Sequence, residues 1–82
     1  MVSLFILRGL SLPGAEKYLF EAGYVEGATI QKNSLEYDFI LIYVYVLNDE
    51  DGKIVDQVGY AEHCLIDEDG EPDAFKVEWI RL

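Results

Sequence analysis

A run of twelve residues in the middle of the chain constrains the fold more than any other feature: Glu36 to Leu47, with the sequence E-Y-D-F-I-L-I-Y-V-Y-V-L. β-Branched and aromatic side chains dominate this run, and both favour extended backbone, so it predicts a long strand. Side chains alternate between the two sides of a strand, which gives this one two apolar faces. One face holds Tyr37, Phe39, Leu41, Tyr43 and Tyr45, and the other holds Ile40, Ile42, Val44 and Val46.

The amino-terminal third predicts one strand and one helix. Val2 to Leu7 is a nearly continuous apolar run, typical of a strand buried on both faces, and we expect it to be central in the sheet. A helix is expected to begin after Ser11, a suitable N-cap, with Pro13 in its first turn, and to end before Gly23. Its apolar stripe consists of Leu12, Ala15, Leu19 and Ala22.

The carboxyl-terminal half predicts two more strands. Lys53 to Cys64 is the first, although Gly59 interrupts its alternation and is a candidate bulge. Ala74 to Leu82 alternates cleanly and is the second. It is expected to place Phe75, Val77 and Trp79 inward and Lys76 and Glu78 outward. Ala28 to Gln31 is ambiguous between a short strand and a loop, and Lys32 to Ser34 has the composition of a turn.

Together these elements predict a single domain over residues 1–82 of the α+β class. We expect a mostly antiparallel four- to five-stranded sheet with one amphipathic helix packed on one face, in the order β-α-β-β-β. If Tyr60 to Ile66 is helical instead, the order becomes β-α-β-β-α-β, a trimmed ferredoxin-like layout. A chain of this size buries only about 60–65 % of the surface that its unfolded form exposes, so the core must be thin.

The tetrapeptide D-E-D-G occurs twice, at Asp49 to Gly52 and at Asp67 to Gly70, and each copy resembles part of a calcium loop. An EF-hand loop needs an oxygen ligand at its first position, Gly at its sixth and Glu at its twelfth. When each Gly is placed sixth, Leu47 and Leu65 stand first, and neither loop has Glu at its twelfth position. The spacing therefore excludes an EF-hand and favours two hairpin turns, at opposite ends of the strand between them.

Other chemical signatures are weak. His63 and Cys64 are neighbours, and on a strand their side chains point to opposite faces, so we do not expect a nucleophile and its base here. A single cysteine excludes an internal disulfide, and one Cys with one His is too few ligands for structural zinc. We therefore expect no catalytic residue, no cofactor and no metal. Arg8 ends the first apolar run far short of a membrane span, and the location expected is cytoplasmic.

The negative charge is concentrated in one stretch of the chain. The formal net charge is -10, from 16 acidic and 6 basic residues, which disfavours direct contact with nucleic acid or an anionic membrane. Between positions 49 and 73 the only base is Lys53, so these 25 residues carry a charge of -9. The ten acids of this stretch, called the acidic stretch below, are Asp49, Glu50, Asp51, Asp56, Glu62, Asp67, Glu68, Asp69, Glu71 and Asp73.

Two functional hypotheses follow. In the first, Asp56 and Glu62 share a strand face and join the two turns into a line of carboxylates. Carboxylates on alternate residues of a strand lie about 6–7 Å apart, a spacing of the same order as that of phosphates on a nucleic-acid strand. The protein would then dock on a basic, nucleic-acid-handling partner and inhibit it, as nucleic-acid mimics and anti-CRISPR proteins of viruses do, an analogy of size and charge alone. The simpler reading is that the acids only keep a small domain soluble.

The second hypothesis is a homo-oligomeric structural or accessory subunit. Here Tyr37, Tyr43 and Tyr45 form the contact between copies, because one helix can cover only one face of the long strand and exposed aromatic area usually marks an interface. An enzyme that uses pairs of Asp or Glu with a metal stays open as a third alternative, without the ligand spacing that would support it.

Overall fold

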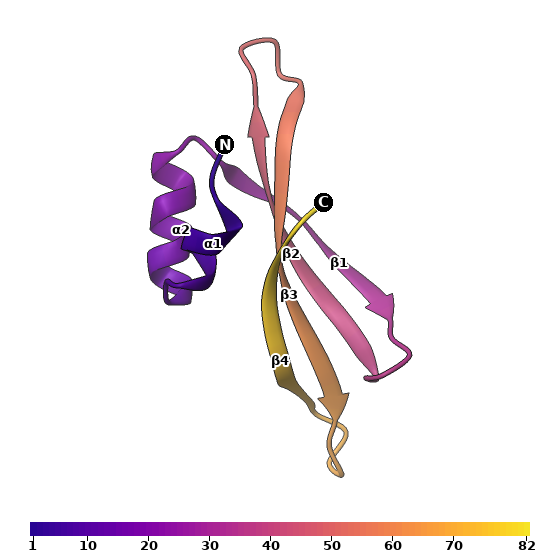
Figure 1. Ribbon diagram of the computed structural model, residues 1–82. Helices are drawn as coiled ribbons and strands as arrows, with labels where there is room; N and C mark the ends of the chain where they lie inside the picture. The colour runs from indigo at the N-terminus through magenta and orange to yellow at the C-terminus, as the bar shows by residue number, and fades with distance from the viewer.

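A computed structural model describes all residues, 1–82, as two short helices followed by four strands. The helices are α1 (Leu4–Arg8) and α2 (Leu12–Glu21). The strands are β1 (Val25–Asn33), β2 (Phe39–Asn48), β3 (Ile54–Ile66) and β4 (Pro72–Arg81). Each strand pairs antiparallel with the next, so the sheet order is β1-β2-β3-β4 (Figure 1). The α+β class and the antiparallel sheet are confirmed, whereas the predicted element order is wrong.

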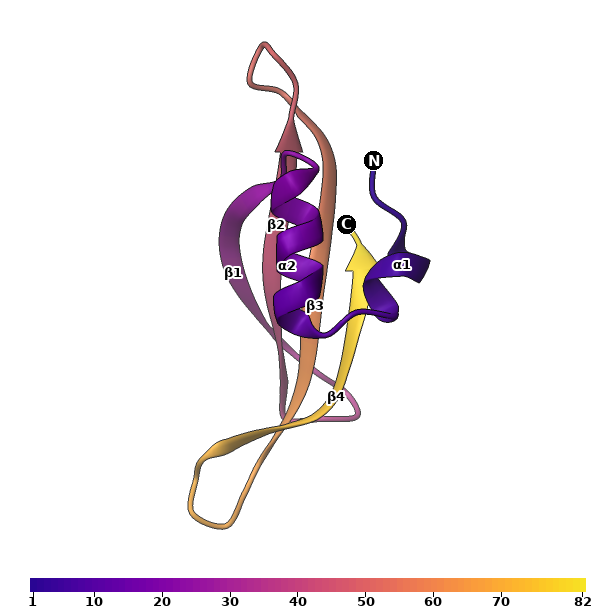
Figure 2. The same cartoon turned by 90° about the vertical axis from the view of Figure 1, so that its left-hand side faces the viewer.

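Both helices lie on the same side of the sheet. α2 runs along β2 and β3, and α1 lies beside the end of β4 (Figure 2). α2 begins as predicted: Ser11 is its N-cap, and the Ser11 hydroxyl accepts a hydrogen bond from the Gly14 amide at 3.3 Å. Gly23, with φ of +94°, follows its end and turns the chain into β1.

The main core lies between α2 and the middle of the sheet. Tyr45 of β2, Val58 of β3 and Trp79 of β4 are buried on the helix side, where they pack with Leu7 and Leu19 in one cluster. Register places these three sheet residues side by side, because Tyr45 pairs with Val58 and the neighbouring Tyr60 pairs with Trp79. The predicted alternation of β2 is thus confirmed, and its tyrosine side is the side that the helices cover.

The opposite face of the sheet has no covering layer. Ile42, Val44 and Ala61 are nevertheless buried there, with four partly buried neighbours: Ile30, Ile40, Val46 and Ile80. Gly59 lies among them in regular register opposite Val44, so the predicted bulge at this glycine is wrong. A Cβ at position 59 would stand 2.6 Å from the Cγ2 of Ile42. The absence of a side chain at Gly59 therefore allows Ile42 to pack directly against the backbone of β3.

The predicted central strand at Val2 to Leu7 is a five-residue helix instead. Leu7 of α1 is buried in the core, whereas Phe5 is 85 % exposed, so the segment has one buried side rather than two. The Arg8 guanidinium donates to the carbonyl of Trp79 at 3.1 Å and ties α1 to β4. A short apolar run has no periodicity that separates strand from helix, and contact with β4 decides between them.

Three further expectations on the strands are corrected. The ambiguous segment Ala28 to Gln31, and the predicted turn at Lys32 and Asn33, belong to the edge strand β1. Tyr60 to Ile66 lies within β3, which removes the ferredoxin-like alternative. Trp79 faces inward as predicted, and Val77 is exposed because the helices stop short of this half of β4. Phe75 is 70 % exposed because the β3–β4 register shifts there and leaves it unpaired, and its ring packs on Tyr37 with centroids 5.8 Å apart.

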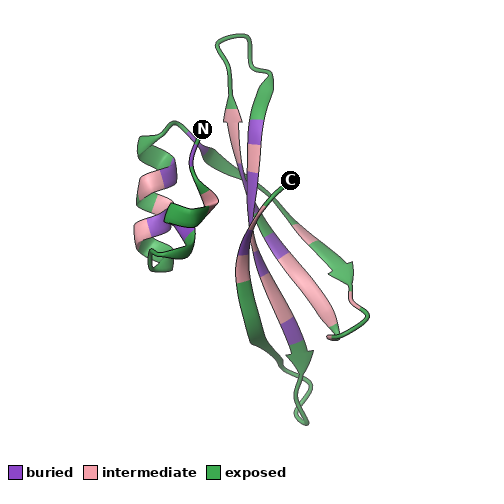
Figure 3. Ribbon diagram, in the orientation of Figure 1, coloured by how far each residue is buried: buried purple, intermediate pink, exposed green.

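The molecule is elongated, with principal extents of 47 × 25 × 18 Å. The β2–β3 turn projects from one end and the β3–β4 turn from the other, both well beyond the helices (Figure 1). Most buried residues lie in the middle of the sheet and on the inner sides of the helices, and both hairpin turns of β3 are exposed (Figure 3). Cys64, near the end of β3, is also buried.

Candidate functional site

The two D-E-D-G copies form two turns of the same design. In the first, the Asp49 carboxylate accepts hydrogen bonds from the amides of Asp51 and Lys53, both at 2.9 Å. In the second, the Asp67 carboxylate accepts from Asp69 and Glu71, also both at 2.9 Å. Each turn ends on a glycine of positive φ, +80° at Gly52 and +79° at Gly70. The repeat is therefore a turn motif in which the first and last residues are structural and the middle two face solvent.

The turns lie at opposite ends of β3, as predicted. One joins β2 to β3 and the other joins β3 to β4, so the acids of each turn stand at one tip of the elongated molecule (Figure 1). Eight of the ten residues of the acidic stretch lie in these turns or beside them and are exposed. They are Asp49, Glu50, Asp51, Asp67, Glu68, Asp69, Glu71 and Asp73.

Asp56 has a different place, although it shares the helix-side face of β3 with Glu62 as expected. It is only 7 % exposed and forms an ion pair with Arg81 of β4, with the Arg81 Nε donating to Asp56 Oδ1 at 3.0 Å. The Tyr24 hydroxyl also donates to this carboxylate. Arg81 and the other hydrogen bonds hold the pKa of Asp56 below its ordinary value, despite burial. The expected continuous line of carboxylates is therefore interrupted at Asp56, which is committed to the fold.

The three tyrosines expected to share one open face are separated. Tyr45 is 5 % exposed beneath α2, and Tyr43, two residues earlier on the same side, is 36 % exposed. Tyr37 precedes β2 and packs on His63, with ring centroids 5.1 Å apart, on the other side of the sheet. Alternation fails at Tyr37 because the chain is no longer in the strand there.

A cavity of about 330 Å³ opens between α2 and the strands β1, β2 and β3. Its walls include three tyrosines and three glutamates, together with the backbone of Gly27 and the side chain of Leu12. The six are Tyr43, Tyr45, Tyr60, Glu16, Glu26 and Glu62. Of these, sequence reasoning singled out Glu62, Tyr43 and Tyr45, for other surfaces. It missed Glu16, Glu26 and Tyr60, which reach the cavity from three different elements and share no sequence pattern.

The charges at the cavity act on its phenols. Burial first, and then the nearby Glu16 and Glu26 carboxylates, raise the pKa of Tyr45 to about 12. A hydrogen bond to Glu62, followed by burial, raises the pKa of Tyr43. Neither Lys nor Arg lines the cavity, and the two ion pairs of the protein lie elsewhere, at His63–Glu78 and Arg81–Asp56.

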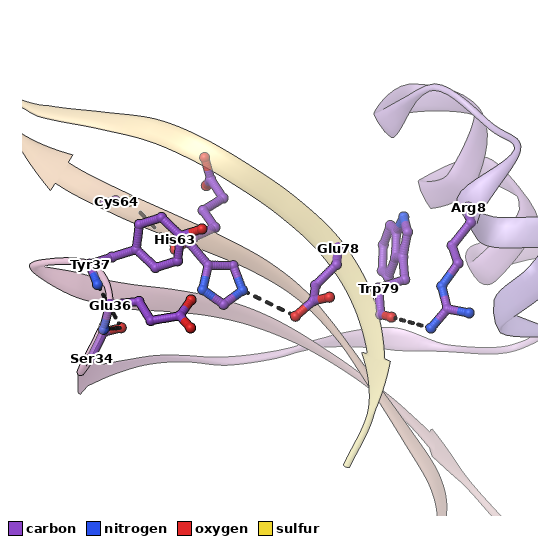
Figure 4. A network of polar contacts seen from close by, with 9 residues as sticks. Arg8, Ser34, Glu36, Tyr37, His63, Cys64, Glu78 and Trp79 are labelled. Atoms are coloured by element: carbon purple, nitrogen blue, oxygen red, sulfur yellow. Dashed lines mark hydrogen bonds and ion pairs between the residues drawn. The ribbon is translucent and has the colours of Figure 1, made fainter.

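His63 and Cys64 point to opposite faces of β3, as expected for neighbours on a strand. Figure 4 shows the His63 ring beside Tyr37, with its Nε2 at 3.1 Å from a Glu78 carboxylate oxygen. The Cys64 thiol is buried and donates weakly to the carbonyl of Glu62 at 3.5 Å. Burial raises the pKa of Cys64, so the reactive thiolate is disfavoured.

No group of three or more His, Cys, Asp or Glu side chains is arranged to hold a metal ion. Neither helix has the length and apolar character needed to cross a membrane. Comparison with models of protein families, with curated proteins and with solved structures finds no match to this chain.

Proposed function

We propose that this chain is a small binding protein without catalytic activity, which docks its acidic surface on a basic, nucleic-acid-handling protein and inhibits it. The docking residues are the exposed acids of the two turns, together with Glu62. Asp56 is left out of the docking set because its carboxylate is engaged by Arg81 and Tyr24.

The observation that supports this proposal is that these acids form no ion pairs with basic residues of the same chain. Nine of the ten acids in the acidic stretch have no ion-pair partner within the protein, since only Asp56 is paired. Their charges project at both tips of a molecule 47 Å long, which allows a basic surface to be engaged at two separated points. Unpaired carboxylates of one sign raise the rate and specificity of association with a positive patch more than they raise affinity.

The test compares two charge-matched variants. Glu50→Gln with Glu68→Gln removes one charge from each turn and leaves the structural Asp49 and Asp67 in place. The control removes two charges that lie outside the acidic stretch: Glu21→Gln with Glu36→Gln. All four glutamates are exposed, so each variant should fold like the parent.

Each protein is immobilised and challenged with a host-cell extract, and the captured proteins are purified and assayed for nucleic-acid binding with and without the chain. We expect a basic protein whose nucleic-acid binding is blocked by the parent. Its affinity should fall in the turn variant and not in the control, by a margin that shrinks as salt increases. Equal affinity for the turn variant and the control, at low and at high salt, would refute the proposal.

The second candidate function is a homo-oligomer. Its contact surface is now the sheet face opposite Tyr43 and Tyr45. Tyr45 is covered by α2, whereas the isoleucine and valine side chains on the opposite face of β2 have no layer over them. A second copy could pair with this apolar face. Light scattering at two protein concentrations should then give a dimer mass that Ile40→Lys reduces to a monomer mass. A monomer mass for the parent at both concentrations excludes this candidate.

A further inference from the structure

The cavity between α2 and the sheet has the chemistry of a site for a cation. Three aromatic residues, Tyr43, Tyr45 and Tyr60, line it together with three glutamates. A cation gains from an aromatic face and from a carboxylate at the same time, most strongly where water is partly excluded. The volume of about 330 Å³ is of the size that holds one long side chain rather than a bare metal ion.

The aromatic wall is held in place before any ligand arrives. Trp79 packs beneath it, with its ring centroid 5.0 Å from that of Tyr60 and 5.8 Å from that of Tyr45. Phe20 of α2 packs on Tyr45 at 6.1 Å. Because these rings are already ordered by the core, a ligand would lose little free energy in arranging them.

Tyr45 connects the aromatic wall to the carboxylates. The residue is only 5 % exposed, and it lines the cavity. Besides burial, a hydrogen bond between its hydroxyl and the Glu16 carboxylate contributes to its raised pKa, so one phenol and one carboxylate already meet at the wall of the cavity.

We propose that this cavity, here called the tyrosine–glutamate pocket, binds the guanidinium group of an arginine side chain from a protein partner. Arginine fits better than a quaternary ammonium because its five N–H donors match carboxylate and phenol acceptors, while its flat face stacks on a tyrosine ring. The inference rests on the proposed function, since it assigns to the basic partner one arginine that enters the pocket.

The binding test uses short capped peptides and the full chain in solution. Acetyl-Gly-Arg-Gly-amide is titrated into ¹⁵N-labelled protein and amide chemical shifts are followed. The neutral acetyl-Gly-Gln-Gly-amide and tetramethylammonium serve as probes without the guanidinium. We expect the arginine peptide to shift the amides of Gly27, Thr29 and Tyr43 at the pocket, and to bind at least about tenfold more tightly than tetramethylammonium, which has no donors.

The pocket variant is Glu16→Gln with Glu26→Gln, which keeps side-chain shape and removes two charges that line the pocket and are not among the docking residues. It should weaken binding of the arginine peptide at least about tenfold, whereas the turn variant Glu50→Gln with Glu68→Gln should leave it unchanged. Retention of the amide spectrum and of Trp79 fluorescence shows that each variant is folded. Equal binding of the arginine peptide by the parent and the pocket variant would overturn the inference, and so would equal binding of the arginine and glutamine peptides.

A longer peptide separates this inference from the proposed function. Acetyl-(Arg-Gly)₆-amide can reach both the pocket and a turn. If the turn variant weakens its binding and the pocket variant does not, the pocket is refuted while docking by the turns stands. If the pocket variant alone weakens binding, the pocket stands and docking by the turns is refuted. If the parent binds neither peptide, both ideas are refuted.

Discussion

Replacement of Asp56 with Ala should destabilise the fold substantially. The carboxylate accepts two hydrogen bonds from Arg81, at 3.0 and 3.2 Å, and one from Tyr24, and through these it joins β3 to β4 and to the start of β1. The Arg81 guanidinium also donates to the carbonyl of Val2 at 2.6 Å, so the amino-terminal segment is anchored to the same group. The substitution would leave Arg81 and Tyr24 without their shared acceptor.

The expected cost follows from how far each partner can return to water. Removal of one member of a fully buried ion pair costs about 3–5 kcal/mol. The Arg81 side chain is 38 % exposed and can regain some hydration, so we expect a cost of about 2–4 kcal/mol. For a domain of this size about 1 kcal/mol lowers Tm by roughly 4–8 °C, which gives a decrease of about 10–30 °C.

Urea unfolding measures this cost, with the fluorescence of Trp79 as the probe, since it is the only tryptophan and is buried in the core. The control is Asp51→Ala, at an exposed turn position whose side chain accepts no hydrogen bond from the protein, and it should change stability by less than about 0.5 kcal/mol. An Asp56→Ala variant within the same limit of the parent would refute the reasoning.

The same group gives a pH dependence of known sign. The pKa of Asp56 is lower in the folded protein than its ordinary value of 3.8, so the folded state holds this proton less tightly than the unfolded state does. The stability from Asp56 is therefore fully present above pH 3.8 and is lost as the pH falls through the lower folded pKa. The difference in unfolding free energy between the parent and Asp56→Ala should shrink over that range, and a constant difference down to pH 2 would contradict the assignment.

Three further predictions concern the turns, the uncovered face and the pocket. Asp49→Ala removes the acceptor of two amide hydrogen bonds and should cost about 1 kcal/mol in urea unfolding, whereas Glu50→Ala in the same turn should be nearly neutral. Gly59→Ala forces a Cβ against Ile42 and should cost about 1–3 kcal/mol; an unchanged urea midpoint would show that the face is not packed there. Absorbance titration should find that Tyr45 ionises near pH 12, and its contribution to stability should be lost between pH 10 and 12 because the unfolded phenol loses its proton first. Replacement with Phe should remove this phenol and its share of the loss, and should leave the contributions of Tyr24, Tyr43 and Tyr60, whose pKa values are also raised.

Most local features of the fold could be read from the sequence. The strand at Glu36 to Leu47 was predicted within three residues at its start and one at its end, because its composition favours extended backbone over its whole length. The cap at Ser11 and the two Asp-Gly turns were also predicted, since each depends on a side chain bonding to backbone a few residues away.

Features that depend on distant partners were predicted poorly. Val2 to Leu7 is apolar enough for a strand, yet it is a helix because Leu7 fills a core that Trp79 and Tyr24 complete. Phe75 was placed inward by alternation, but a register shift between β3 and β4 leaves it unpaired, and it is exposed beside Tyr37. The candidate pocket shares this cause, since Glu16, Glu26 and Tyr60 are brought together only by the packing of α2 on the sheet.

Composition and short-range pattern were sufficient for the strand-rich α+β class, the hairpin turns and the location of the charge along the chain. They could not assign roles to individual acids. Glu50 and Asp56 look equivalent in the sequence, but Glu50 faces solvent at a tip, whereas Asp56 meets Arg81, 25 residues away, and Tyr24, 32 residues away. Whether a carboxylate is free to meet a partner depends on which cation and which donors the folded chain brings within hydrogen-bond distance of it, and those contacts exist only after the sheet has formed.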